Sequence, residues 1–178
     1  MVSVNPDYFF ILNFHFKKPE YYYQPVRVLL KQLNKLLNQQ KDLSGIPLHT
    51  PKGSFLNRAL GRTGIYDLAL TELVWQLSKA EGNCVDVGAN VGYISRIMQI
   101  KGGGSGKTFS FEPNPDILPF LEMNRNNTPF RSSWTIISKG LGSGQNWMAL
   151  NRPKDYLSNY GTAYLSPLNE TDLERVEI

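Results

Sequence analysis

Apolar residues recur at helical spacing in two segments of the N-terminal half of the chain. Between residues 26 and 40 they return every three or four positions, with Lys and Arg between them, which predicts an amphipathic helix whose apolar stripe docks on the rest of the domain. Binding to a membrane surface is less favoured because the stripe contains no aromatic residue. Residues 66–80 repeat the helical period and end near Gly82, a common helix stop. The intervening residues 42–64 are rich in Gly and Pro, which predicts a loop or a short hairpin.

Short apolar runs replace the helical period over the remainder of the chain. The first run, Cys84 to Val87, predicts a buried strand that leads through a glycine-rich turn into a helix. A strand at 107–112 and a helix to about Arg125, with Asp116 as its N-cap, come next. Further strands are predicted at 134–138, 147–150 and 175–178, and residues 156–172 are predicted to be loop. Strands that alternate with helices in this way indicate an α/β fold built on a parallel sheet.

Composition and charge are those of an ordinary globular protein. The 178 residues, 41% hydrophobic and 19% charged, are enough for about one domain with its own core. The formal net charge of +4 comes from residues 1–83, which hold ten Lys or Arg against six Asp or Glu, whereas residues 84–178 hold nine of each. A solvated basic helix explains this excess better than an anionic partner, and no nucleic-acid partner is expected.

The location of the protein is predicted from two features. No apolar run reaches the roughly 20 residues that span a bilayer. A single cysteine excludes an internal disulfide, so a cytoplasmic location is predicted.

Four residues around the first two strands carry the candidate chemistry. Asp86 lies in the first strand, Gly88 and Gly92 bracket the turn that follows, and Glu112 ends the next strand, 24 residues after Gly88. Glycines admit a tight strand-to-helix turn, and they also let a ligand approach the backbone where the following helix presents N–H donors. A carboxylate at the end of the second strand can accept two hydrogen bonds from a ribose diol. Together these residues predict a nucleotide-type cofactor site.

The negative charge of Asp86 distinguishes between the candidate cofactors. A dinucleotide places its pyrophosphate over the glycine turn, where a carboxylate would repel it, whereas an amino group and a sulfonium would be attracted. The spacing from Gly88 to Gly92 also departs from the G-x-G-x-x-G pattern of dinucleotide-binding proteins. Both observations favour S-adenosylmethionine and leave a dinucleotide-dependent oxidoreductase as the weaker alternative.

Three other features are interpreted as structural. Residues 102–108 resemble a phosphate-binding loop, but Lys101 stands where that loop needs Gly and a strand follows where it needs a helix, so a connector is predicted. His15 and His49 lack the spacing of metal ligands, and no metal site is predicted. Cys84 lies inside the first strand and is predicted to be a packed core thiol.

Three segments together resemble the FkbM-type family of class I S-adenosylmethionine-dependent methyltransferases. They are Gly-Ile-Tyr-Asp at 64–67, Val-Asp-Val-Gly-Ala-Asn-Val-Gly-Tyr at 85–93 and Phe-Ser-Phe-Glu-Pro-Asn-Pro at 109–115. With a looser match at 137–142, the likeness covers about residues 48–178 and leaves residues 1–47 as an N-terminal aromatic and helical extension. The resemblance implies a Rossmann-like, doubly wound sheet with helices on both faces. It also implies methyl transfer, with a small molecule or glycan, often a sugar or natural-product hydroxyl, as the acceptor.

The resemblance also implies roles for individual residues. The methionine end of the cofactor would be lined by Asp86, Gly88, Ala89, Asn90 and Gly92. Glu112 would hold the ribose, and Ser138 would lie near the adenine. Asp67 and Ser138 depart from the Glu and Asn that the family commonly has at these positions.

The family's next strand, which ends in an Asp-x-Glu-Gly motif and pairs with the first strand, has no counterpart in this sequence. The apolar residues of the segment 84–87 are typical of a strand covered on both sides. The sequence is therefore expected to be an incomplete copy, truncated before the fourth core strand. The alternative to an active methyltransferase is a non-catalytic remnant or fragment that binds the cofactor or nothing. No catalytic base is assigned.

Overall fold

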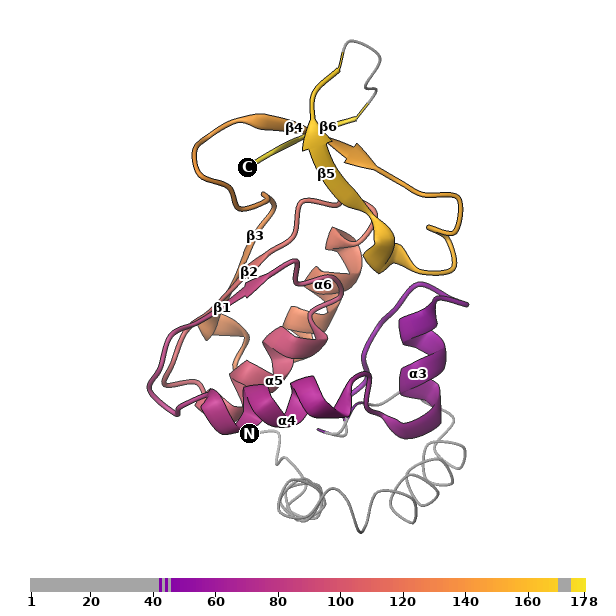
Figure 1. The fold of residues 1–178 in the computed structure, drawn as a ribbon. Helices are drawn as coiled ribbons and strands as arrows, with labels where there is room; N and C mark the ends of the chain where they lie inside the picture. Colours follow the sequence, from indigo (N-terminus) through magenta and orange to yellow (C-terminus); the bar gives the residue numbers. More distant parts are fainter. Residues whose placement is uncertain (1–41, 43, 45, 170–173) are drawn as a thin grey trace.

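The computed structural model describes residues 42, 44, 46–169 and 174–178 (Figure 1). The helix predicted at 26–40 and almost all of the predicted N-terminal extension lie outside the described residues. The described helices are α3 (Phe55–Thr63), α4 (Leu68–Leu77), α5 (Tyr93–Gly102) and α6 (Leu118–Asn126), with short 3-10 turns at Arg131–Ser133 and Tyr160–Thr162. The described strands are β1 (Cys84–Val87), β2 (Thr108–Phe111), β3 (Trp134–Ile137), β4 (Trp147–Asn151), β5 (Tyr164–Pro167) and β6 (Arg175–Glu177).

A parallel sheet in the order β1-β2-β3 forms the centre of the fold. Each strand is joined to the next through a helix, α5 between β1 and β2 and α6 between β2 and β3. This alternation confirms the Rossmann-like α/β class predicted from the sequence. Helices α4, α5 and α6 lie on one side of the sheet in Figure 1.

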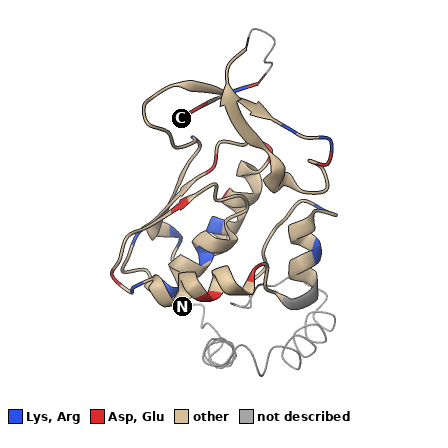
Figure 2. Cartoon of the chain, viewed as in Figure 1, with Lys and Arg blue, Asp and Glu red and all other residues tan. Residues whose placement is uncertain are grey.

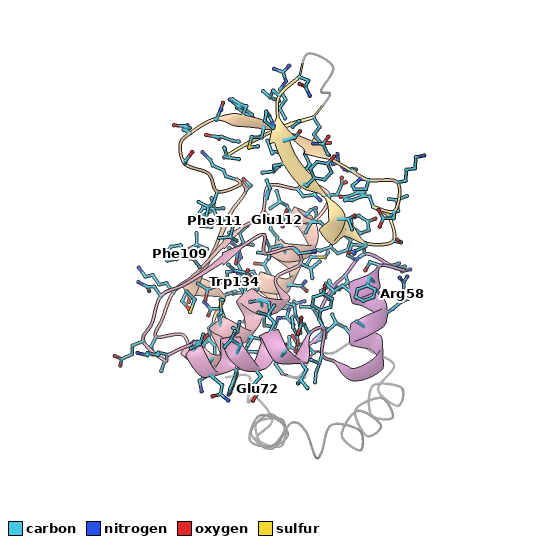
Figure 3. All side chains as sticks on the ribbon, in the orientation of Figure 1. Arg58, Glu72, Phe109, Phe111, Glu112 and Trp134 are labelled. Carbon is cyan, nitrogen blue, oxygen red and sulfur yellow. The ribbon has the colours of Figure 1, made fainter. Side chains whose placement is uncertain are left out.

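The two faces of this sheet differ in polarity. Asp86 and Ser110 lie on the face under α5, where each makes a hydrogen bond to Ser95 of that helix. The opposite face carries Val85 and Val87, which are 53% and 61% exposed, and the two phenylalanines of β2, which point away from the helices in Figure 3. Among the described residues, no helix covers this apolar face.

Two small clusters of buried side chains hold α5 and α6 to the rest of the domain. The first contains Leu48, Leu60, Val91, Tyr93 and Ile117. The second contains Ala89, Leu121 and Trp134, and it lies between the start of α5, α6 and the sheet.

A buried ion pair joins the start of the described chain to α5. Arg96 is 0% exposed and donates from Nη1 to Asp42 Oδ2 at 3.0 Å. The same nitrogen donates to the carbonyl oxygen of Pro47 at 3.0 Å, and Nη2 donates to that of Asn124 at 3.0 Å. A single guanidinium therefore holds together the N-terminal segment, α5 and the end of α6.

The C-terminal strands form a separate antiparallel sheet, in the order β5-β4-β6. It lies over the carboxyl ends of the parallel strands in Figure 1. Tyr156 joins it to the segment after β2, because the Tyr156 hydroxyl donates to Asp116 Oδ2 and accepts from Asn114 Nδ2, each at 2.8 Å. Arg152 donates to the same Asp116 oxygen at 3.0 Å and pairs with Glu174.

Three local predictions of secondary structure were wrong, and the strand at 84–87, predicted to be buried, has Val85 and Val87 exposed. Residues 42–64 contain helix α3, which begins after Ser54, whose side chain accepts from the backbone N–H of Asn57, and ends at Gly64. The N-cap of α6 is Ile117, and the Asp116 carboxylate binds Tyr156 and Arg152 instead of capping the helix. The region 156–172, predicted to be loop, contains strand β5. Its residues do not predict a strand, and the strand is formed by antiparallel pairing with β4.

Lys, Arg, Asp and Glu are interspersed along the described chain (Figure 2). Among the described residues, no group of three or more His, Cys, Asp or Glu is arranged to hold a metal ion. None of the helices in the described part of the chain is long and apolar enough to span a membrane.

Candidate functional site

The turn between β1 and α5 is fixed by backbone hydrogen bonds to the end of β2. The N–H groups of Gly88 and Ala89 both donate to the carbonyl oxygen of Phe111, at 2.9 and 3.0 Å. The next N–H, that of Asn90, donates to Glu112 Oε2 at 2.8 Å. Three consecutive donors of the turn therefore bind the last residues of the neighbouring strand, which brings the sequence-predicted residues of both segments together.

The two glycines of the turn have different surroundings. Gly88 and Gly92 both have a positive φ, 76° and 84°, a conformation that glycine adopts without strain. A Cβ on Gly92 would lie 2.6 Å from Leu121 Cδ1 and 2.8 Å from Trp134 Cζ2, whereas a Cβ on Gly88 would have no atom within 4 Å. Gly92 is thus required for packing of α5, and Gly88 faces open space.

Glu112 is buried, with 7% of its surface exposed. Its two carboxylate oxygens accept one backbone N–H each, from Asn90 at 2.8 Å and from Asn114 at 2.9 Å. Burial raises the pKa of Glu112 above its ordinary value, and these two hydrogen bonds partly oppose that rise. Each carboxylate oxygen has a second lone pair, so the group can accept two more hydrogen bonds.

Asp86 is oriented by a chain of hydrogen bonds from the sheet beneath α5. Trp134 Nε1 donates to Ser110 Oγ at 2.7 Å, Ser110 Oγ lies 2.6 Å from Ser95 Oγ, and Ser95 Oγ donates to Asp86 Oδ2 at 2.5 Å. Burial raises the pKa of Asp86, and the bond from Ser95 lowers it in part. Each Asp86 oxygen has two lone pairs, so the carboxylate keeps acceptor capacity for a cationic or hydrogen-donating ligand beside its bonds to Ser95.

A cavity of about 270 Å³, called here the first cavity, opens beside Glu112. Its wall combines the glycine turn and the end of β2 with the C-terminal sheet. The lining residues are Val87, Gly88, Asn90, Phe111, Glu112, Pro113, Asn114, Ile117, Gly140, Leu141, Leu150, Tyr160, Gly161, Ala163, Tyr164 and Leu165. Apolar side chains around one carboxylate suit a ligand with a flat apolar part and hydroxyl donors.

A second cavity, of about 470 Å³, lies on the α4 side of the same turn. Asp86 belongs to its wall and Glu112 to that of the first cavity, while Val87, Gly88, Asn90 and Gly161 line both. The two carboxylates therefore line two different cavities that share part of their walls, and the Asp86 charge contributes to the raised pKa of Glu112.

Two of the predicted site residues line neither cavity, Gly92 in the turn and Ser138 after β3. The Ser138 side chain is exposed, and the segment after β3 instead contributes Gly140 and Leu141 to the first cavity. The adenine contact at Ser138 stays a prediction, and Ser138 contributes nothing to the wall of either cavity. Sequence reasoning also missed Leu150, Tyr164 and Leu165, because no local signal shows that the C-terminal strands fold over the glycine turn.

The segment 102–108 connects α5 to β2, as predicted, and contributes nothing to either cavity. His49 lies away from the site, with Nε2 at 2.9 Å from Asn127 Nδ2. The thiol of Cys84 is half-buried in β1.

A scan against protein-family models and a search of curated proteins find no match. Among solved structures, a Plasmodium falciparum protein described as a protein-L-isoaspartate O-methyltransferase, in complex with S-adenosyl-L-homocysteine, is 20% identical with a TM-score of 0.36, over 40% of this chain and 37% of that one. A Pyrococcus horikoshii protein described as a transferase is 16% identical with a TM-score of 0.39, over 53% of this chain and 36% of that one. The P. horikoshii protein TYW2, in complex with MeSAdo, is 13% identical with a TM-score of 0.40, over 68% of this chain and 50% of that one. The match thus spans half or less of each solved chain, and the fold class stated above rests on this chain's own sheet topology.

Proposed function

We propose that this protein binds S-adenosylmethionine across the β1–α5 turn and is a methyltransferase. The observation that supports the proposal is that Asp86 and Glu112 line two different cavities, which share part of the glycine turn as a common wall. S-adenosylmethionine carries a ribose diol in its nucleoside half and a sulfonium and an ammonium in its methionine half, which matches one carboxylate in each cavity.

The first cavity fits the nucleoside half of the cofactor. Glu112 retains two free lone pairs for the ribose hydroxyls, and its carboxylate is already oriented by the N–H groups of Asn90 and Asn114. Gly140, Leu141 and Leu165 offer apolar surface for the adenine ring. The open space at Gly88 lets the ligand pass close to the backbone, as the sequence motif predicts.

Asp86 fits the methionine half. A carboxylate that is half-buried and oriented by Ser95 attracts the positively charged groups of the cofactor. The same carboxylate would repel the pyrophosphate of a dinucleotide, which argues against a nicotinamide-dependent oxidoreductase. Ala89 and Gly92 contribute by shaping the turn between the two ends.

When bound, S-adenosylmethionine supplies an electrophilic methyl group. The role of the protein's own residues is to hold the acceptor oxygen in line with that methyl and to exclude water. We propose a hydroxyl of a sugar or natural product as the acceptor, because the segments 85–93 and 109–115 resemble those of FkbM-type methyltransferases. No base is assigned to remove the hydroxyl proton.

Binding of S-adenosylhomocysteine and of NAD⁺ to the full chain, measured by titration calorimetry, tests the cofactor assignment. The proposal predicts one-site binding of S-adenosylhomocysteine and no detectable heat with NAD⁺. Binding of NAD⁺ alone would show that the cofactor is wrong. Transfer of a radiolabelled methyl group to candidate acceptors then separates an enzyme from a remnant that binds the cofactor without turnover.

A further inference from the structure

The second cavity has an apolar wall built mainly from α3, α4 and α5. Phe55 and Leu56 come from α3, Leu70 and Val74 from α4, and Met98 from α5. Its volume of about 470 Å³ lies within the range of small-molecule sites, roughly 300 to 1,000 Å³. The cavity therefore has room for more than the methionine end of the proposed cofactor.

Aromatic rings form one side of this cavity. The rings of Phe55 and Tyr66 meet edge to face, with centroids 6.2 Å apart, and those of Tyr66 and Tyr93 meet in the same way at 6.3 Å. The Tyr93 hydroxyl lies 3.0 Å from Thr71 Oγ1 of α4 and is thereby held in place. Edge-to-face packing and this hydrogen bond keep the aromatic surface in one arrangement.

The cavity wall contains few polar groups. Besides the hydroxyls of Tyr66 and Tyr93, they include the Asp86 carboxylate and the amides of Asn90 and Asn159, and no Lys or Arg is among the described lining residues. A phosphorylated or otherwise anionic ligand would meet one carboxylate and no compensating cation, at an electrostatic cost. A ligand with an apolar body could instead bury that body against the rings and direct one hydroxyl toward the turn.

We infer that the second cavity binds the methyl acceptor, and that the acceptor is an uncharged alcohol or phenol with an apolar body. This inference rests on the proposed function, because the acceptor hydroxyl has to reach the glycine turn where the cofactor methyl would lie. It deepens that function by selecting an apolar acceptor over a polyol such as a free sugar.

Two leucines of α4 provide a matched pair of variants. Leu70 lines the cavity and Leu73 does not, yet both are exposed on the same helix, by 40% and 55%. Leu70→Arg places a long cation in the cavity wall, whereas Leu73→Arg places it in solvent. Because both side chains are partly exposed, both variants should fold, and thermal melting of each checks this. Leu70→Ala, which shortens the wall without adding a charge, is a milder third variant.

The probe is 2-naphthol, an uncharged phenol whose fluorescence reports its binding to the full chain. Leu70→Arg is expected to weaken binding at least about 10-fold, Leu70→Ala less, and Leu73→Arg by no more than about 2-fold. Methyl transfer from S-adenosylmethionine is expected to favour 2-naphthol over methyl glucoside by at least about 10-fold in kcat/KM. Equal effects of the two arginine variants, no binding of 2-naphthol, or a preference for the glucoside would overturn the inference.

Titration of S-adenosylhomocysteine into the same variants separates this inference from the function on which it rests. If all variants bind S-adenosylhomocysteine and 2-naphthol binding is weakened most in Leu70→Arg, less in Leu70→Ala and little in Leu73→Arg, both the inference and the proposed function are supported. If S-adenosylhomocysteine does not bind the unmodified chain, the proposed function is wrong, and so is the assignment of the ligand as a methyl acceptor. If S-adenosylhomocysteine binds but 2-naphthol does not, only the acceptor assignment fails.

Discussion

The Glu112 carboxylate accepts a hydrogen bond from the backbone N–H of Asn90 at 2.8 Å. Glu112, which follows β2, therefore fixes the turn between β1 and α5 in the absence of a ligand. A side chain that both shapes the turn and faces the first cavity links the conformation of the site to its binding chemistry. The same residue consequently has effects on stability and on affinity that have to be measured separately.

Substitutions at the two glycines of the turn should have different effects, Gly92 mainly on packing and Gly88 mainly on ligand binding. Gly92→Ala adds a methyl group against Leu121 and Trp134 and should lower the free energy of unfolding by about 2–5 kcal/mol, from the left-handed backbone and the overpacking together. Gly88→Ala adds a methyl group in open space, so it should cost only the backbone strain of about 1–2 kcal/mol.

Urea unfolding and titration with S-adenosylhomocysteine, on both variants, measure the two effects. Gly88→Ala should weaken binding more than it destabilises the fold, because its new methyl group lies where the ligand is proposed to pass. Equal loss of stability in both variants, with unchanged affinity in Gly88→Ala, would assign the two glycines the same structural role.

Asp86 should make cofactor binding depend on pH. Burial raises the pKa of its carboxyl in the free protein, and a cationic ligand beside it favours the ionised form. Binding should therefore release a proton at pH values below the raised pKa, and affinity should rise with pH until Asp86 is ionised in the free protein.

Calorimetry in two buffers of different ionisation heat measures that proton release. Asp86→Asn should abolish it and weaken binding. Ser95→Ala removes a hydrogen bond that lowers the Asp86 pKa, so it should move the pH dependence to higher pH. A pH dependence that is the same in all three proteins would exclude Asp86 as its source.

The buried ion pair between Arg96 and Asp42 should contribute strongly to the fold. Asp42→Asn leaves the guanidinium of a residue that is 0% exposed without its counter-charge, and should lower the free energy of unfolding by about 3–5 kcal/mol. Glu174→Gln is the comparison, because the Arg152–Glu174 pair is partly exposed and should be worth about 1 kcal/mol or less. Equal losses in chemical denaturation of the two variants would show that burial does not distinguish the pairs.

The elements around the turn could be predicted because their signals are local. Strands β1, β2 and β3 agree with the predicted runs to within one residue, and the positions of Gly88 and Glu112 relative to them follow directly. Helix α3 was not predicted because the glycines and prolines on either side of it make the whole region 42–64 resemble a loop. Gly53 precedes the Ser54 cap and Gly64 ends the helix.

The rest of the site depends on contacts between distant segments. Ser95, Ser110 and Trp134 orient Asp86 from a helix and two strands, and nothing in their spacing along the chain indicates this. The same holds for Tyr164 and Leu165, which reach the first cavity only because β5 pairs with β4. Sequence therefore predicted the two carboxylates and the turn, while the cavity walls had to come from the structure.

Titration of S-adenosylhomocysteine into the unmodified chain, Glu112→Ala and Glu122→Ala tests the central claim most directly. Glu122 is exposed on α6 and lines neither cavity, so it controls for the loss of a carboxylate. The account predicts one-site binding to the unmodified chain, unchanged affinity for Glu122→Ala, and a loss of about 10- to 100-fold for Glu112→Ala at a temperature where all three are folded. Equal affinity of Glu112→Ala and the unmodified chain, or no binding to the unmodified chain, would contradict it.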